Sequence, residues 1–428
     1  MTRTIYFLLA VIAIVSAFIF GRLTALPPTV EEAPVQNVSD LEAAYQDFIE
    51  AQTETLDFFK SQEFFDSSQN KAEAYRTLLW SMVGAIKIDA LHNRNHPRFI
   101  RSVDYASKSG LDNPDNTYFV TQLHDDGEYK ITGTRGSTKG LVFQLLLGQP
   151  GVGSAGTSTN IDILYADDMV TDPEGNFEII VSRNNPGEGL NWLELKVGAK
   201  TLIVRHTHSD WNSEEIGSLN ITSLKLDMQS DILSEEVMAE RLNAAATAIR
   251  DRNKSWIGLA NAIWERAPRN IMTPPRPTPG GLVGQYSAFG TFELEDDEAL
   301  ILTSYPSGAD YQGIQLGNRW FTSLDYETRL TTLTPAQSYQ SEDGALHYVI
   351  SHRDPGIQNW LDTESHSQGL IMMRWQGTST GPAKAPFMRL IKFDELDELL
   401  PPNTPKFSAA DRARQISARQ LAVKKRFP

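Results

Sequence analysis

The chain has 428 residues, of which 40% are hydrophobic and 22% are charged, and its net charge is −15. This composition is ordinary for a soluble globular body, and it excludes a largely disordered chain or a protein that crosses the membrane many times. The length leaves room for two domains with helical additions. Phosphate binding depends on clustered Lys and Arg, so we expect no nucleic acid among the partners of this acidic body.

An apolar run without charges, residues 5–20, lies between Arg3 and Arg22. As a helix it would measure about 24 Å, short of the roughly 30 Å hydrocarbon core, and the two arginine side chains could extend its reach. We expect an uncleaved membrane anchor rather than a signal peptide, because the run is long for one and a good cleavage site is missing. The N-terminal positive charge predicts an extracytoplasmic body, periplasmic in a bacterium.

The chain contains no cysteine, so it has no disulfide, no thiolate metal site and no cysteine nucleophile. It also lacks a Gly-x-Ser-x-Gly elbow, a phosphate loop, a dinucleotide fingerprint and a His-Glu-x-x-His helix. We therefore expect no cofactor. No standard enzyme signature identifies a reaction.

Helical patterns precede and separate two sets of predicted strands. Ser39 and Glu42 form a capping box before apolar residues at helical spacing, and a second helical pattern covers residues 72–91. A third helix is predicted over residues 234–265, with Ser234 as its N-cap. We expect the first two helices to pack against the strands that follow them.

The remaining sequence consists largely of short apolar or alternating runs separated by Gly, Asp, Asn and Pro. Such runs, at intervals of about ten residues, indicate antiparallel β-sandwiches or barrels. One set lies within residues 118–206 and another within residues 292–375, in the same order. The predicted fold class is therefore mainly β, with helical additions.

One stretch of sequence occurs twice, as residues 175–205 and as residues 344–374. In each copy a Gly opens a strand-like run, a Pro-Gly turn and Asn-Trp-Leu follow, and the copy ends in Arg205 or Arg374. We interpret this as a tandem duplication of a β domain. Two such domains are expected to pack side by side, with a groove between them.

The predicted domain order follows from these patterns. It is a membrane anchor or signal segment (1–26), a stalk (27–38), a helical addition (39–95), a first β-sandwich domain (96–232), a helical insertion (233–272), a linker (273–289), a second β-sandwich domain (290–395) and a basic C-terminal tail (396–428).

The end of the tail has a charge of its own. Residues 401–428 carry seven Lys and Arg against Asp411 alone, so this part is +6 and the remainder −21. We expect a solvated helix capped by Ser408. Anionic lipid and the protein's own acidic surface are the alternative contacts of such a helix.

Several motifs resemble a known family. They are residues 96–99 (His-Pro-Arg-Phe), 112–115 (Asp-Asn-Pro-Asp), 129–133, 191–193, 210–211 and, most specifically, 353–362 (Arg-Asp-Pro-Gly-x-x-Asn-Trp-Leu-Asp). Over roughly residues 70–395 the chain resembles the bacterial proteins catalogued as domain of unknown function 1214, often paired with a sister domain numbered 1254. The resemblance implies jelly-roll sandwiches with helical insertions, and it implies no agreed activity or catalytic residue.

His206 and His208 are the candidate metal ligands. They lie two residues apart at the end of a predicted strand, so both imidazoles should lie on one face, as in metal-binding β-barrels. The first following glutamate, Glu214, does not match the spacing of metal-binding cupins. A metal site and an exposed strand end are the two interpretations.

The candidate binding residues are Asp112, Asn113, Asp115, Trp192, Arg205, Arg353, Asp354, Trp360 and Arg374. Asp112 and Asp115 present two carboxylates on a tight loop, although Asp and Asn before Pro also suit a turn. The two tryptophans occupy equivalent positions, as rings that close each sandwich or as platforms for a sugar. We expect the two repeat-end arginines to pair with the acidic residues that follow the tryptophans, Glu194 and Asp362.

The leading hypothesis is a membrane-anchored, extracytoplasmic twin β-sandwich protein that binds a glycan or another envelope component between its two domains. The alternative is a hydrolase, or another carbohydrate- or lipid-modifying enzyme, with an acidic site at the seam. A purely structural role in the envelope is a third possibility, and the oligomeric state stays open. Convergence of Asp112, Asp115, Arg353 and Asp354 in one pocket would favour the enzyme.

Overall fold

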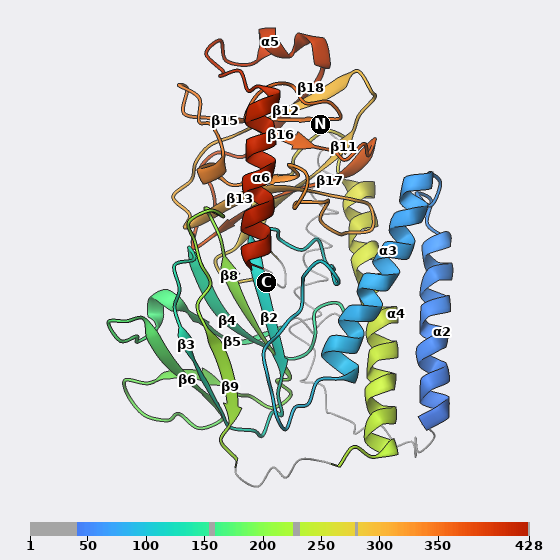
Figure 1. Cartoon of the computed structure of the whole chain (residues 1–428), viewed down its shortest axis with the longest axis vertical. Helices are drawn as coiled ribbons and strands as arrows, with labels where there is room; N and C mark the ends of the chain where they lie inside the picture. The colour runs from blue at the N-terminus through green and yellow to red at the C-terminus, as the bar shows by residue number, and fades with distance from the viewer. Residues whose placement is uncertain (1–40, 154–158, 226–231, 279–280, 427–428) are drawn as a thin grey trace, which may run out of the picture.

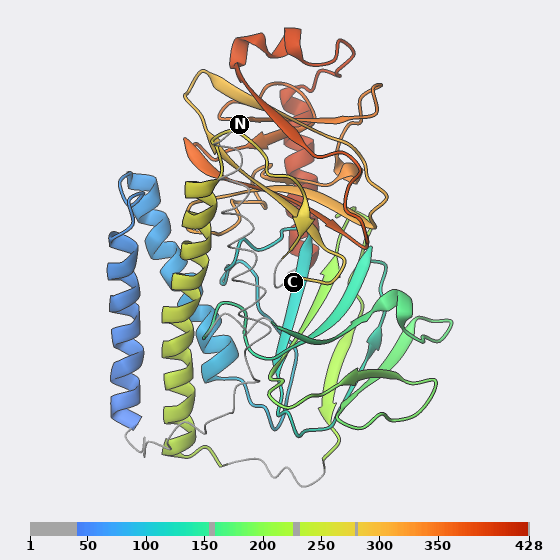
Figure 2. The ribbon, with the colours of Figure 1, turned by 180° about the vertical axis from the view of Figure 1, so that it is seen from behind.

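The computed structural model describes residues 41–153, 159–225, 232–278 and 281–426. Within these ranges no helix is both long and apolar enough to cross a membrane. The predicted anchor and stalk, residues 1–38, lie outside the described residues. Figures 1 and 2 show two β-sandwiches, one above the other, with long helices standing along one side.

The first sandwich pairs a five-stranded sheet, in the order β1-β2-β8-β4-β5, with a four-stranded sheet, in the order β7-β6-β3-β9. Its strands are β1 (Ile100–Arg101), β2 (Asn116–Gln122), β3 (Tyr129–Thr134), β4 (Gly140–Leu146), β5 (Asn160–Tyr165), β6 (Asn176–Ser182), β7 (Asn191–Glu194), β8 (Thr201–Thr207) and β9 (Leu219–Ser223).

The second sandwich repeats this arrangement strand for strand, with sheets in the orders β10-β11-β17-β13-β14 and β16-β15-β12-β18. Its strands are β10 (Arg276–Pro277), β11 (Tyr286–Glu293), β12 (Glu298–Ser304), β13 (Tyr311–Gly317), β14 (Thr332–Leu333), β15 (Leu346–Ser351), β16 (Trp360–Asp362), β17 (Gln368–Gln376) and β18 (Phe387–Lys392). β10 and β11 begin inside the predicted linker, so the second sandwich starts earlier than the sequence suggested.

The two copies also share an exception to the predicted antiparallel pairing. β6 pairs with β7 in parallel, and β15 pairs with β16 in parallel, whereas the other strand pairs described are antiparallel. In both copies the connection that contains the Pro-Gly turn returns the chain alongside the strand it has just left. The prediction of purely antiparallel sheets is therefore wrong at this point of each sandwich.

Each sandwich has its own apolar core between its two sheets. Ile131, Phe143 and Val204 belong to the first core, and Tyr348 and Trp375 belong to the second. Side chains alternate between the two faces of a strand, so the neighbouring residues of the same strands point away from these cores. This alternation determines which residues form the outer faces discussed below.

The helices are α2 (Leu41–Lys60), α3 (Ser68–Ala85), the π-helix η1 (Ile86–Ala90), α4 (Glu235–Arg266), α5 (Leu396–Leu399) and α6 (Ala409–Arg426), with 3-10 turns η2 (Ala166–Asp168), η3 (Pro335–Gln337) and η4 (Phe393–Glu395). The helices predicted before the strands and between the two sets are confirmed, and Ser234 accepts the backbone N–H of Val237 at 3.3 Å. The expectation that the first two helices pack against the strands that follow them is wrong for α2 and α3, which pack with α4 and with Trp320 of the second sandwich. Trp320 lies among Phe59, Phe64 and Phe65.

The C-terminal helix α6 lies along both sandwiches (Figure 1). Ser408 caps it as predicted, because its hydroxyl accepts the N–H of Asp411 at 3.2 Å. The prediction of a solvated helix is wrong for one face. Arg412, Arg419 and Arg426 are spaced by seven residues and are all buried. The helix therefore joins the two sandwiches through its basic residues.

Candidate functional site

The Asp112–Asp115 motif lies in the joint between the two sandwiches. The Asp115 carboxylate accepts the Trp211 indole N–H at 2.8 Å and the Tyr311 hydroxyl at 2.6 Å. Asn113 Nδ2 donates to the same tyrosine oxygen at 3.0 Å. Burial raises the pKa of Asp115, and burial likewise raises the pKa of Tyr311 well above its ordinary value. The side-chain oxygens of both residues are hydrogen-bonded to other residues of the protein.

Asp112 and the arginine of the second repeat complete this joint. The Asp112 carboxylate accepts the Ser323 hydroxyl at 2.8 Å. Arg374 is buried and donates to the carbonyl oxygen of Leu111 at 2.7 Å and to the side chain of Gln315. The predicted loop with two carboxylates is thus a structural contact inside the protein.

The expected pairing of Arg205 and Arg374 with acidic residues is wrong. Arg205 donates to the Gln144 side chain, as its counterpart donates to Gln315. Glu194 instead pairs with Lys196 at 3.0 Å, and Asp362 pairs with Arg329 at 2.8 Å. The reason is that the arginines belong to the five-stranded sheets and the acidic residues to the four-stranded sheets.

Arg353 and Asp354 lie near the N-terminal end of α6, whereas Asp115 lies near the C-terminal end of this helix. Asp354 accepts Arg412 Nε at 2.9 Å, and the Arg353 guanidinium lies 4.1 Å from the ring centre of Phe393. Arg426, fourteen residues further along the same helix, donates to Pro114 O beside Asp115. This spacing corresponds to about 21 Å of helix. The four polar residues weighed for an enzyme therefore do not share one pocket.

Trp192 and Trp360 occupy equivalent positions and make the same hydrogen bond. Each indole N–H donates to the carbonyl oxygen of a serine at the end of the preceding strand, Ser182 at 3.0 Å and Ser351 at 3.2 Å. The second ring is buried and lies 5.0 Å from the Arg412 guanidinium, whereas the first is half-buried. The shared contact identifies both rings as structural elements of the repeat.

His206 and His208 are buried, which corrects the expectation of an exposed strand end. Their rings lie 3.2 Å from Thr138 Oγ1 and 3.3 Å from Thr117 Oγ1, respectively. Burial lowers the pKa of His206 to about 3 and that of His208 to about 2, so both are neutral at ordinary pH. The described residues contain no group of three or more His, Cys, Asp or Glu placed to hold a metal ion.

A groove of about 670 Å³ lies on the outer face of the four-stranded sheet in the first sandwich. Its floor comes from residues of β3, β6 and β9 that alternate with core residues, and its walls come from the loops that precede β6 and β7. The lining residues are Thr132, Gly133, Thr134, Val170, Thr171, Asp172, Asn176, Phe177, Glu178, Gly189, Leu190, Asn191, Ser218 and Asn220.

Asn191, at the start of β7, fastens one wall of this groove. Its side-chain oxygen accepts the backbone N–H of Val170 at 2.7 Å, and its Nδ2 donates to the Val170 carbonyl at 2.8 Å. Nδ2 also donates to the carbonyl of Glu178 at 2.8 Å. One buried side chain thus holds the loop before β6 against the sheet.

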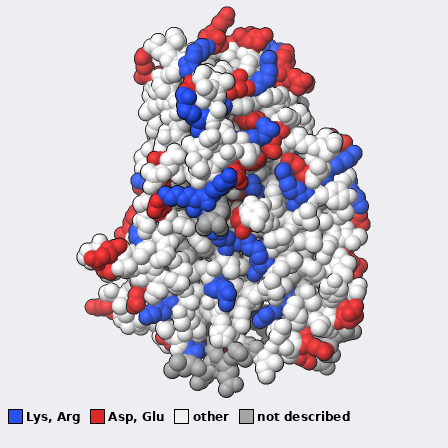
Figure 3. All heavy atoms as spheres, in the orientation of Figure 1, with Lys and Arg blue, Asp and Glu red and all other residues white. Residues whose placement is uncertain are grey.

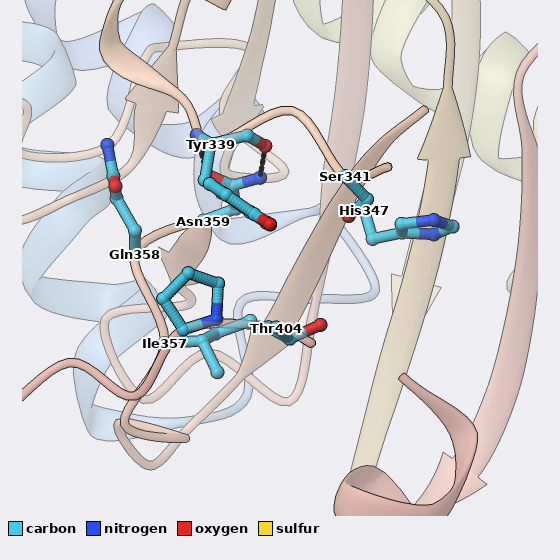
Figure 4. A pocket seen from close by; sticks show the side chains of 8 residues that line it. Tyr339, Ser341, His347, Ile357, Gln358, Asn359 and Thr404 are labelled. Carbon is cyan, nitrogen blue, oxygen red and sulfur yellow. Dashed lines mark hydrogen bonds between the residues drawn. The ribbon is translucent and has the colours of Figure 1, made fainter. Parts of the chain in front are cut away.

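The second sandwich contains the same pocket in a closed form (Figure 4). Asn359 holds Tyr339 as Asn191 holds Val170, with two hydrogen bonds of 2.7 Å. The pocket measures about 10 Å³, because Thr404 and Pro405 of the C-terminal segment also line it. The remaining lining residues are Tyr339, Ser341, His347, Ile357, Gln358 and Asn359.

The covering of the second pocket continues over part of the outer face of its sheet. Ile301 and Val349 on that face pack with Leu396 and Leu400 of the C-terminal segment. In the strand register, Lys130 stands in the first sandwich where Ile301 stands in the second. A charged residue in place of an apolar one leaves the first face suited to solvent or to a polar ligand.

Sequence reasoning missed this groove. The repeated Asn-Trp-Leu drew attention to the tryptophans, whereas the asparagine builds the pocket wall. The change from Leu190 to Gln358 just before that asparagine gave no specific signal, because the two repeats differ at most of their positions.

Comparison with known proteins supports the fold and names no activity. No protein-family model and no curated protein matches the sequence. A crystal structure of an uncharacterised protein from Burkholderia cenocepacia is 25% identical, covers 84% of this chain and 99% of its own, and has a TM-score of 0.75. A protein from Vibrio parahaemolyticus, 10% identical over 83% of this chain and 100% of its own, has a TM-score of 0.42 and carries no argument.

Proposed function

We propose that this is a binding protein of the cell envelope, held at a membrane by its N-terminal segment, which binds an envelope component in the groove of the first sandwich. The observation that carries the proposal is the contrast between two equivalent pockets, about 670 Å³ in the first sandwich and about 10 Å³ in the second. Each sandwich forms this pocket, and the C-terminal segment closes the copy in the second sandwich. Only the open copy is available to a ligand.

The proposed binding site is this groove, and not the joint between the two sandwiches that we expected from the sequence. At the seam, Asp115 and Tyr311 are buried and bonded to each other, and the arginines of α6 cover the neighbouring Trp211. A ligand there would have to displace these contacts. A ligand can bind in the groove without displacing such contacts. The polar lining of the groove suits a hydrogen-bonding ligand such as a glycan or a peptide.

The membrane attachment and the extracytoplasmic position of the body are part of the proposal. They are supported by the apolar run of residues 5–20 and by Arg3 before it. We further propose that the two sandwiches descend from one duplicated jelly-roll unit of the kind catalogued as domain of unknown function 1214. The identical strand order supports the duplication, and the sequence motifs support the family.

The enzyme alternative has no comparable support. It required Asp112, Asp115, Arg353 and Asp354 to converge, and these residues lie in two separate places. We therefore propose binding without catalysis.

A pair of single-cysteine reporters tests the proposed site. The chain has no cysteine, so Asp172→Cys in the open groove and Ser341→Cys in the closed pocket each introduce a unique thiol. The full-length Asp172→Cys protein in detergent, carrying an environment-sensitive dye on the introduced thiol, would be titrated with neutral oligosaccharides and with short unstructured peptides. We expect a saturable change in fluorescence with at least one of the two probe classes.

The Ser341→Cys protein is the matched control, because the same fold element is closed there. Labelling of this thiol should be slow compared with labelling of the groove thiol. If neither class of probe changes the signal of the groove reporter, the proposed site is wrong.

A further inference from the structure

The closed pocket shows what kind of chain segment this fold can hold. We define the closing segment as residues 400–407. Leu400 is buried in the apolar cluster on the outer face, and the Phe407 N–H donates to the Gly356 carbonyl at 2.7 Å. Between these anchors, Lys406 forms an isolated antiparallel bridge with Ile357, and Thr404 and Pro405 line the pocket. Pro401 to Thr404 form a turn, closed by the Thr404 N–H that donates to the Pro401 carbonyl at 2.9 Å, and the residues after this turn pair with the turn before β16.

The composition of the closing segment explains its restricted backbone. It contains Pro401, Pro402 and Pro405. Proline fixes its own φ near −65° and disfavours helix for the residue before it. Such a segment is already close to its bound shape, so little conformational entropy is lost when it docks. Proline-rich segments are accordingly common ligands of shallow grooves.

The equivalent surface of the first sandwich has no such cover. Residues 183–190, which include the matching turn, are exposed. A side chain at Gly187 or Gly189 would meet no atom within 4 Å. Val170 and Leu190 are 60% and 55% exposed on either side of the Asn191 contact. These two apolar side chains offer a surface for proline rings at the edge of a polar groove.

The charge around the groove favours a basic ligand. Residues 166–190 contain six carboxylates, Asp167, Asp168, Asp172, Glu174, Glu178 and Glu188, against one basic residue, Arg183. Lys130, on the same sheet face, pairs with Glu178 at 3.2 Å, and Arg183 pairs with Asp125 at 3.1 Å. None of the described residues that line the groove is Lys or Arg. In Figure 3 acidic side chains gather on the projecting loops at the left edge of the first sandwich. The closing segment itself carries Lys406 next to its pocket-lining proline.

We infer that the groove of the first sandwich binds a proline-containing, basic segment of a partner protein, in the way that the second sandwich holds residues 400–407 of its own chain. This inference rests on the proposed function and names the class of its ligand. Backbone pairing with the turn before β7 would supply affinity, and the apolar and acidic edges of the groove would select proline and a basic residue.

The closing segment supplies the probe. A synthetic peptide with the sequence of residues 399–408, capped at both ends and fluorescently labelled, would be titrated with the full-length protein in detergent. We expect saturable binding. Replacing the three prolines of the peptide by glycine should weaken binding roughly tenfold, because the free peptide then has more conformations to lose. Raising the salt concentration should weaken it further.

Two protein variants locate the binding. Leu190→Arg places a cation on the edge of the groove and should weaken peptide binding at least about tenfold, because it removes an apolar contact and repels the lysine of the peptide. Val197→Arg is the matched control. Val197 is 70% exposed on the same sandwich and does not line the groove. The control should bind the peptide as the wild type does.

The outcomes separate this inference from the proposed function. Absence of saturable binding up to about 1 mM peptide overturns the inference, as does binding that Leu190→Arg leaves unchanged. If chitotriose binds to the wild type and is lost in Leu190→Arg while the peptide does not bind, the proposed site stands and the peptide inference falls. If neither probe binds, both fall.

Discussion

Asn191 and Asn359 fasten equivalent loops with the same two hydrogen bonds. Each side-chain amide accepts the backbone N–H and donates to the backbone carbonyl of one loop residue, Val170 in the first sandwich and Tyr339 in the second, at 2.7–2.8 Å. Both asparagines are buried. The wall of the open groove and the wall of the closed pocket are therefore held by one device, used twice.

This device predicts matched losses of stability. Asn191→Ala and Asn359→Ala should each lower the free energy of unfolding by about 1–3 kcal/mol, because buried backbone groups lose their partners. Asn212→Ala, at an exposed position, should change it by less than about 0.5 kcal/mol. Chemical denaturation of the three variants measures the difference. Equal stabilities of all three would contradict the proposed role of the amides.

The contacts at the joint between the sandwiches predict that removing two different tyrosine hydroxyls has unequal effects on stability. Tyr311→Phe should lower the free energy of unfolding by about 1–3 kcal/mol, because Asp115 then loses a buried hydrogen-bond donor. Tyr286→Phe removes an exposed hydroxyl that donates to the Ser379 carbonyl at 3.0 Å, and it should cost less than about 0.5 kcal/mol. Urea denaturation monitored by tryptophan fluorescence compares the two. A Tyr311→Phe protein as stable as the control would show that the joint does not depend on this contact.

The buried histidines predict how stability depends on pH. Their pKa values in the folded protein, about 3 for His206 and about 2 for His208, lie below the ordinary 6.5. As the pH falls below 6.5, the unfolded chain therefore takes up protons that the folded chain does not bind, and stability is lost down to the folded pKa values. Each histidine contributes a slope of up to about 1.4 kcal/mol per pH unit.

Replacing both by glutamine should flatten the decline in stability between about pH 6 and pH 4.5. Denaturation curves at several pH values measure this slope for the wild type, for His206→Gln with His208→Gln, and for the control His96→Gln. His96 is exposed, so the control should keep the wild-type slope. A double variant with the wild-type slope would mean that other groups govern the acid sensitivity.

The docked face of α6 predicts unequal effects of its arginines. Arg419 is buried, donates to the carbonyls of Thr332 and Tyr326, and lies 4.3 Å from the Trp211 ring. Arg419→Ala should cost about 2–4 kcal/mol and should expose α6 to proteolysis. Arg414→Ala should have almost no effect, because that residue is exposed and pairs only with Asp411 along the same helix. Limited proteolysis and denaturation distinguish the two, and equal behaviour would argue that α6 is not docked through this face.

Local patterns were enough to predict the β-sandwich class, the duplication signal and the helices. Each depends on residues close in sequence, such as the Pro-Gly and Asn-Trp-Leu of the two repeats. The seam could not be predicted in this way. Asn113 and Tyr311 are separated by 198 positions, and no periodicity connects them. Aspartate before proline also fits an ordinary turn, so the motif did not reveal that its carboxylate is buried.

The docking of α6 and the groove escaped prediction for different reasons. The seven-residue spacing of Arg412, Arg419 and Arg426 was present in the sequence, but a basic stripe is ordinarily solvated, and only the acidic and aromatic surface beneath it explains its burial. The groove arises from a segment that covers one copy and not the other. The copies themselves look alike in the sequence, so the absence of cover is visible only once the chain is folded.

The position of α6 in the chain has a consequence for the order of folding. Both sandwiches precede Arg426, whose guanidinium lies 4.0 Å from the Trp211 ring and whose N–H donates to Pro114. Each sandwich has its own core and can form as its strands are synthesised, whereas α6, which contacts both sandwiches, is synthesised last. A newly made chain therefore passes through a stage in which contacts such as Asp115 with Tyr311 and Arg374 with Leu111 join the two sandwiches before α6 is in place.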